Sequence, residues 1–291
     1  MTATKLRPEN EATVPQVGTV LYVNAPFDQA YEAIRDANGT LASSRDVARA
    51  RIHPGARHSV SQYGSWVKEG FIYTAKQNPL FVLESPLVDA QRARDATSAH
   101  RSGKDFYLDD KTAKMYLDQL DEDAQKAPEA RRVIRFGTNQ NHNIPTNRFA
   151  DDEVTRFLFK DAAAEYGSFL ASQGITEMPV WLTDKDHVNK QKASFVRQLW
   201  LHGLDDDIRS GINGSYGDLF DDCRVRGVRP SNAAEGRVRE VSADSGNSEL
   251  AYNAGQINQY RTILQEVRKG DRAASDLEQV LEFIQGLPVK K

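Results

Sequence analysis

Alternation of apolar and polar positions predicts the first elements of the chain. Residues 17–24 (VGTVLYVN) are rich in β-branched residues and predict a strand. A short helix should follow and end at Asn38 and Gly39, because both residue types tolerate the left-handed backbone that a helix terminus requires. Residues 41–52 predict a second short helix. Residues 1–16 are polar, contain two prolines and predict a flexible arm.

The next part of the chain again contains segments with the composition of β-strands. Residues 65–74 and 79–85 are apolar, and the QNP turn signal between them predicts a β-hairpin. Residues 86–109 are polar and predict no regular element. An acidic, weakly amphipathic helix is expected over 109–127, followed by a short strand over 131–136.

Helical spacing of apolar residues dominates the segment from residue 151 to residue 200. One long helix is expected over 151–172, and a strand over 177–183. Thr183 and Asp186 stand at the spacing of a capping box, so they should begin a further helix that continues to Trp200.

The last part of the chain predicts two hairpins. Residues 222–230 and 236–243 resemble the two strands of a β-hairpin. Residues 246–291 predict a helical hairpin with one narrow apolar seam on each arm. The seams consist of Leu250, Ile257, Tyr260, Leu264 and Val267 on the first arm, and of Leu277, Val280, Ile284 and Leu287 on the second. Such seams cover the protein's own core, which we favour, or meet another subunit.

The order of these elements predicts an α+β fold. Strands and helices do not alternate strictly, so a mixed sheet with hairpins and several amphipathic helices is favoured over a doubly wound sheet. We therefore expect a flexible arm over 1–16, an α+β body over 17–245, and a helical hairpin over 246–291 that packs on the body or on a partner.

Composition adds limits to this picture. Aromatic residues make up 9% of the 291 residues and the net charge is −3, which argues against disorder of the whole chain. Cys223 is the single cysteine, so no internal disulfide can form. An apolar leader and an 18-residue apolar run are both missing, so we expect a soluble, cytoplasmic protein without a membrane partner.

Motifs of the common enzyme classes do not occur. The sequence contains no phosphate-binding glycine loop, no nucleophile elbow and no zinc-protease motif, and we expect no cofactor. Asp184, Asp186 and His187 could in principle ligate a divalent cation. Negative charge in the first turn of a helix is favoured by the helix dipole, however, and this explains their placement without a metal.

The segment 137–149 (GTNQNHNIPTNRF) holds four asparagines, a glutamine, a histidine and an arginine between a predicted strand and a predicted helix. Its side chains could bind a ligand, because amides donate and accept hydrogen bonds, imidazole titrates near neutral pH and guanidinium pairs with anions. The ligand-binding candidates are Asn139, Asn141, His142, Asn143 and Arg148, with His142 expected near the loop tip. Asparagine also favours turns for purely local reasons, and this simpler interpretation is preferred.

Basic residues concentrate in two places. Residues 45–68 contain five Lys and Arg against one acid, with aromatic residues among them, and the strand at 222–230 adds further arginines. This pattern suits nucleic-acid or anion binding. The candidate residues are Arg49, Arg51, Arg57, Trp66, Arg224 and Arg226. The overall charge of −3 weakens this hypothesis, since dedicated binders carry a basic excess.

The sequence is compatible with three functions. The leading one is a soluble non-catalytic binding or assembly protein, with a protein partner or self-association through the C-terminal helices. The second is an enzyme acting on a phosphate-containing or nucleic-acid substrate through His142 and Arg148. The third is a nucleic-acid-binding module, which is less favoured. Convergence of His142, Arg148, Asp184 and His187 on one concave pocket would favour the enzyme, and their dispersal would favour the binding protein.

Overall fold

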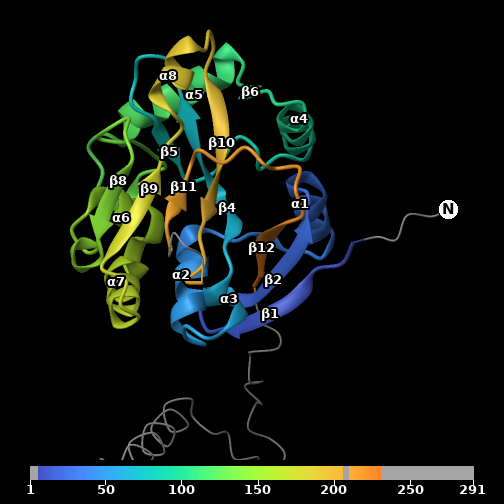
Figure 1. Cartoon of the computed structure of the whole chain (residues 1–291), viewed down its shortest axis with the longest axis vertical. Coiled ribbons are helices and arrows are strands. Elements are labelled where there is room, and N and C mark those ends of the chain that lie inside the picture. Colours follow the sequence, from blue (N-terminus) through green and yellow to red (C-terminus); the bar gives the residue numbers. More distant parts are fainter. Residues whose placement is uncertain (1–5, 206–209, 231–291) are drawn as a thin grey trace, which may run out of the picture. The chain divides into compact units, whose positions relative to one another are not determined.

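A computed structural model describes residues 6–205 and 210–230, and it is built around one large mixed sheet (Figure 1). The main path through the sheet has the order β1-β2-β12-β4-β10-β11-β9-β8. The strands are β1 (Glu9–Val14), β2 (Gly18–Ala25), β3 (Thr40–Leu41), β4 (Ser65–Tyr73), β5 (Leu80–Val82), β6 (Phe106–Tyr107), β7 (Val133–Arg135), β8 (His142–Pro145), β9 (Glu177–Trp181), β10 (Phe195–Leu201), β11 (Ile212–Asn213) and β12 (Cys223–Arg229).

Helices cover both faces of this sheet. They are α1 (Phe27–Asp36), α2 (Ser44–Ile52), α3 (Ser59–Gln62), α4 (Ala90–Arg101), α5 (Asp110–Asp123), α6 (Glu153–Phe159), α7 (Ala163–Ser172) and α8 (Lys185–Lys190), with short 3-10 turns η1 (Pro128–Ala130), η2 (Thr146–Arg148) and η3 (Lys160–Ala162). In Figure 1, α1 and α4 lie on one side of the strands and α6 and α7 on the other. None of the helices in the described ranges is long and apolar enough to cross a membrane.

Strand β4 is the centre of the core, because it is buried along its whole length except at Lys68. Alternate side chains serve the two faces, as the pleat of a strand requires. Val67 and Phe71 pack with α2, α6 and α7, whereas Trp66 and Ile72 pack with α1 and α4. The neighbour β10 runs antiparallel to β4, and β12 runs parallel to it.

The α+β class predicted from the sequence is confirmed by the mixed sheet and its helices. The predicted hairpin of β4 and β5 is present, with Phe71 opposite Phe81. Strand β2, helix α1 and strand β12 also lie where the sequence places them. The strand predicted over 236–243 and the helical hairpin over 246–291 lie outside the described residues.

The first residues of the chain differ from the expectation of a flexible arm over 1–16. Glu9–Val14 form β1, which pairs antiparallel with β2 at one edge of the sheet. The sequence ENEATV carries little strand signal by itself. Its position depends on Glu11, whose side chain is buried against Arg226 and Arg224 of β12. A contact between residues so far apart in the sequence leaves no local pattern.

The helix predicted from Thr183 to Trp200 is wrong. Helix α8 has six residues, its N-cap is Asp184 rather than Thr183, and the chain then enters β10. The apolar residues of FVRQLWL fit helical spacing, but they fit equally a strand that is buried on both faces. Pairing with β4 decides between the two.

Two further helices differ from the sequence prediction. The single helix expected over 151–172 is divided at Lys160, whose φ of 52° lies in the left-handed region. Helix α4 forms within the segment 86–109, for which no element was predicted. Asp89 caps it by accepting hydrogen bonds from the backbone N–H groups of Gln91 and Arg92. The helix buries mainly small side chains, among them Ala93 and Ala96, and therefore shows little apolar periodicity.

Candidate functional site

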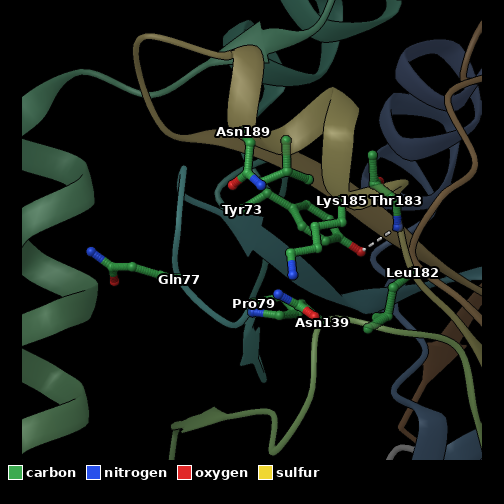
Figure 2. A pocket seen from close by; sticks show the side chains of 9 residues that line it. Tyr73, Gln77, Pro79, Asn139, Leu182, Thr183, Lys185 and Asn189 are labelled. Atoms are coloured by element: carbon green, nitrogen blue, oxygen red, sulfur yellow. Dashed lines mark hydrogen bonds between the residues drawn. The ribbon is translucent and has the colours of Figure 1, made fainter.

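Three segments that are distant in the sequence enclose a surface pocket. They are the turn between β4 and β5, the start of the Asn-rich segment 137–149, and the connection from β9 into α8 (Figure 2). The pocket consists of two adjoining hollows that share Asn139, Leu182, Thr183 and Lys185. The wider hollow, which also includes Asn141 and Asp184, has a volume of about 360 Å³. The narrower one, which includes Val188 and Asn189, has a volume of about 10 Å³, enough for one water molecule, so a larger ligand would lie in the wider hollow.

The floor of this pocket is apolar, and hydrogen bonds of the buried Tyr73 hydroxyl hold it in place. Pro79, Leu182 and Val188 are buried. The Tyr73 hydroxyl donates a hydrogen bond to the Gly214 carbonyl at 3.0 Å and accepts one from the Thr183 N–H at 3.3 Å. Burial raises the pKa of Tyr73, so its phenol is neutral across the physiological pH range and serves as a support rather than as an acid or base.

Two asparagines on the rim are held by backbone groups. The Asn141 Oδ1 accepts a hydrogen bond from the Leu182 N–H at 2.9 Å. The Asn189 Oδ1 accepts one from the Lys76 N–H at 2.8 Å. The side chains of Asn141 and Asn189 are therefore exposed and also held in a defined orientation. Preorganised polar groups of this kind lose less conformational entropy when they bind a ligand.

The charged groups of the pocket come from the beginning of α8. Lys185 is exposed, points toward Asn139 in Figure 2 and forms no ion pair with any described residue. Asp184 caps the helix, because its Oδ1 accepts hydrogen bonds from the N–H groups of Asp186 and His187. Its other carboxylate oxygen makes no hydrogen bond to a described residue.

The ligand-binding candidates proposed from the sequence separate into two groups. Asn139 and Asn141 line the pocket. His142 is exposed, but it begins strand β8 rather than occupying a loop tip, and its ring centre lies 6.3 Å from that of Phe136. Asn143 donates a hydrogen bond to Glu177 on the neighbouring strand. Arg148 lies in η2 with 68% of its side chain exposed.

The four residues that would mark an enzyme do not converge on this pocket. Of His142, Arg148, Asp184 and His187, only Asp184 lines either hollow. The Nε2 atom of His187 lies 2.7 Å from Oδ2 of Asp105. The structure therefore does not bring these four residues together.

Three of the nucleic-acid candidates are buried, so assigning them to a binding surface is wrong. Trp66 lies in the core beneath α1. The guanidinium of Arg51 donates hydrogen bonds to the Tyr166 hydroxyl at 2.7 Å and the Ser210 hydroxyl at 3.2 Å. Arg226 is fully buried and paired with Glu11. The guanidinium groups of Arg51 and Arg226 are thus paired inside the protein, as buried charges must be.

Two of the remaining basic candidates have partners among the described residues. Arg49 pairs with Asp161 at 2.7 Å. Arg224 pairs with Glu11 at 2.9 Å, and its guanidinium lies between two tyrosine rings, 4.3 Å from Tyr22 and 4.6 Å from Tyr63. Arg57 is exposed.

Several residues of the pocket could not be identified from the sequence. Lys185 stands within DKDH, where the acids and the histidine are the possible cation ligands. Tyr73 lies inside a predicted strand. Asn189 is one polar residue in a predicted helix. Their relation depends on β9 and the β4–β5 turn meeting in space, which no local pattern records.

Metal-binding geometry is missing from the described ranges: they contain no group of three or more His, Cys, Asp or Glu side chains that could hold an ion.

The chain matches no known family by sequence, and it matches no curated protein. Its fold is similar to that of a solved structure described as "Accommodation of massive sequence variation in Nanoarchaeota by the C-type lectin fold". The TM-score is 0.52 at 15% identity, and the similarity covers 74% of this chain and 100% of that one. At this identity the similarity concerns the fold alone. The protein thus has a fold similar to the C-type lectin fold.

Proposed function

We propose that the protein is a non-catalytic binding protein that holds a small polar ligand in the pocket between the Asn-rich segment and α8. The observation that carries this proposal is the wider hollow, in which the buried side chain of Leu182 lies beside the oriented amide of Asn141. Ligand sites of proteins typically combine an apolar surface with a few fixed polar groups.

The architecture supports the same proposal. The pocket is formed by connecting segments, while the strands behind them form the core. Loops on a rigid scaffold are the usual place for binding residues. The words describing the solved structure say that the C-type lectin fold accommodates massive sequence variation. A fold that tolerates such variation could present different side chains in the same place, and the amides and Lys185 would be this chain's set.

The two alternatives lose support for different reasons. An enzyme would need its acid, base and anion-binding groups together, and His142, Arg148 and His187 do not line this pocket. A nucleic-acid module would need accessible cations, whereas Arg51 and Arg226 are buried. Association with a protein partner through residues 246–291 stays a proposal that rests on the apolar seams in the sequence.

Side-chain amides give a direct test, because their NH₂ groups are visible in ¹H–¹⁵N correlation spectra. We would titrate the full-length protein with glucose, N-acetylglucosamine, glucuronate and N-acetylglutamine amide at millimolar concentration. At least one probe should shift the NH₂ signals of Asn139 and Asn141, which line the wider hollow, in a saturable way.

Matched variants locate the binding. Asn139→Ala should weaken the affinity for that probe about five- to tenfold, the value of one lost hydrogen bond. His142→Ala and Arg148→Ala, which alter polar side chains of the same segment outside the pocket, should leave the affinity unchanged. If every probe fails to shift these amides, or if His142→Ala weakens binding as much as Asn139→Ala does, the proposal is wrong.

A further inference from the structure

The fixed amides of the pocket present hydrogen-bond donors outward. A backbone N–H can only donate, so the side-chain oxygens of Asn141 and Asn189 must face the N–H groups of Leu182 and Lys76. These two hydrogen bonds settle the orientation of both amides on physical grounds. The NH₂ groups that remain are donors. Figure 2 shows the Asn189 nitrogen on the side of the pocket, whereas Gln77 points away from it.

Lys185 adds a positive charge to this set. It carries three donors and no acceptor, and it pairs with no described carboxylate. Asn139 and Gln140 lie beside it with side chains that make no hydrogen bond to a described residue, so their amides can turn toward a ligand. The donors therefore outnumber the fixed acceptors around the pocket.

Asp184 is the one acidic side chain among the described residues that line the two hollows. One of its oxygens is used as the helix cap, and the other is open. An open carboxylate oxygen repels a second carboxylate but accepts a hydrogen bond from a hydroxyl group. The pocket thus has a donor-rich side around Lys185 and one acceptor next to it.

We infer that the ligand carries a carboxylate with neighbouring hydroxyl groups, as a uronic acid does, and this inference rests on the function proposed above. The carboxylate would lie in the wider hollow against Lys185 and the NH₂ groups of Asn139 and Asn141, and a hydroxyl would donate to Asp184. A phosphate fits less well, because it carries more charge than one lysine balances and is usually held by arginines or by several backbone N–H groups.

Two isosteric probes test the charge. Glucuronate and glucuronamide differ only in having a carboxylate or a carboxamide, and their affinities can be compared by titrating the same side-chain NH₂ signals. Glucuronate should bind about five- to tenfold more tightly at low salt, since hydrogen bonds to a charged group are stronger than neutral ones. The difference should shrink at high salt, because the pair is exposed to solvent.

Variants at position 185 test whether the charge of Lys185 causes the preference for glucuronate. Lys185→Met should abolish the preference for glucuronate, and Lys185→Arg should keep it. Lys192→Met, which removes another exposed lysine outside the pocket, should have no effect. Circular dichroism would verify that each variant is folded.

The outcomes separate this inference from the proposed function. If the pocket amides shift equally with glucuronate and glucuronamide, the carboxylate inference is overturned while a polar binding site remains. N-acetylglutamate amide, added as a further probe, carries a carboxylate without hydroxyl groups; if it binds as tightly as glucuronate, the requirement for hydroxyl groups is overturned. If none of the probes in either panel binds, both proposals are wrong.

Discussion

Glu11 and Arg226 form a two-point ion pair in which both side chains are buried. The Arg226 Nε lies 2.6 Å from the Glu11 Oε2, and a second guanidinium nitrogen lies 3.0 Å from Oε1. The pair joins β1 at the sheet edge to β12. It therefore fixes the first described strand against the strand that precedes the C-terminal residues.

Removal of Glu11 should destabilise the protein strongly. Glu11→Ala would leave a buried guanidinium without its partner, which typically costs about 3–5 kcal/mol. Glu9→Ala, on the exposed side of the same strand, should cost less than about 1 kcal/mol. Urea denaturation of both variants measures the difference. Equal stabilities would mean that β1 contributes little to the fold.

Glu69 should make stability depend on pH. Its carboxylate is fully buried in β4 and accepts hydrogen bonds from the Ser44 N–H. Burial raises the pKa of Glu69 from 4.5 to about 7. The folded state therefore binds this proton more tightly than the unfolded chain, and the free energy of unfolding should fall by about 3 kcal/mol as pH rises from 4.5 through 7.

Glu69→Gln isolates this contribution, because glutamine stays neutral and keeps an acceptor oxygen. The variant should gain stability relative to the wild type between about pH 5 and about pH 8, measured by urea denaturation. Glu84→Gln, on an exposed side chain, should change stability by less than about 0.5 kcal/mol at either pH. A difference between wild type and Glu69→Gln that does not vary with pH would contradict the burial argument.

Gly214 supports the pocket floor and should tolerate no side chain. A Cβ atom there would lie 2.5 Å from the ring of Phe71, which is buried in the core. Gly214→Ala should cost about 1–3 kcal/mol through overpacking. It should also weaken ligand binding, since the Gly214 carbonyl accepts the Tyr73 hydrogen bond.

Gly137→Ala is the matched control, because no atom lies within 4 Å of its added Cβ. Its stability should stay within about 0.5 kcal/mol of the wild type. Thermal denaturation and a probe titration on both variants check the pair. An equal loss in the two would show that the contact with Phe71 is not what excludes a side chain at position 214.

The sequence predicts much of the fold where one local signal is strong. The β-branched run of β2 and the QNP turn between β4 and β5 are two such places. Prediction fails where the local signal is ambiguous, as in β10, whose apolar residues fit a helix equally well. It fails too where distant partners determine the structure, as Glu11 and Arg226 do for β1.

The candidate site was predictable only in part, for a related reason. The density of asparagines drew attention to Asn139 and Asn141, and both line the pocket. The sequence could not show that β8 begins at His142 and removes it from this site. Nor could it show that Lys185 and Asn189 would face the same hollow, because that depends on how α8 lies against the β4–β5 turn.

The central claim is that a polar ligand binds over Leu182 in the wider hollow. The most direct measurement is the set of intermolecular nuclear Overhauser effects between glucuronate and the methyl-labelled protein. The account predicts effects from the sugar ring protons to the methyl groups of Leu182, which lines both hollows of the pocket. Two other hollows, of about 510 Å³ each, lie on the far side of β4 and include Leu41, Val88 and Met115. Effects confined to those three residues would place the ligand elsewhere and contradict the account.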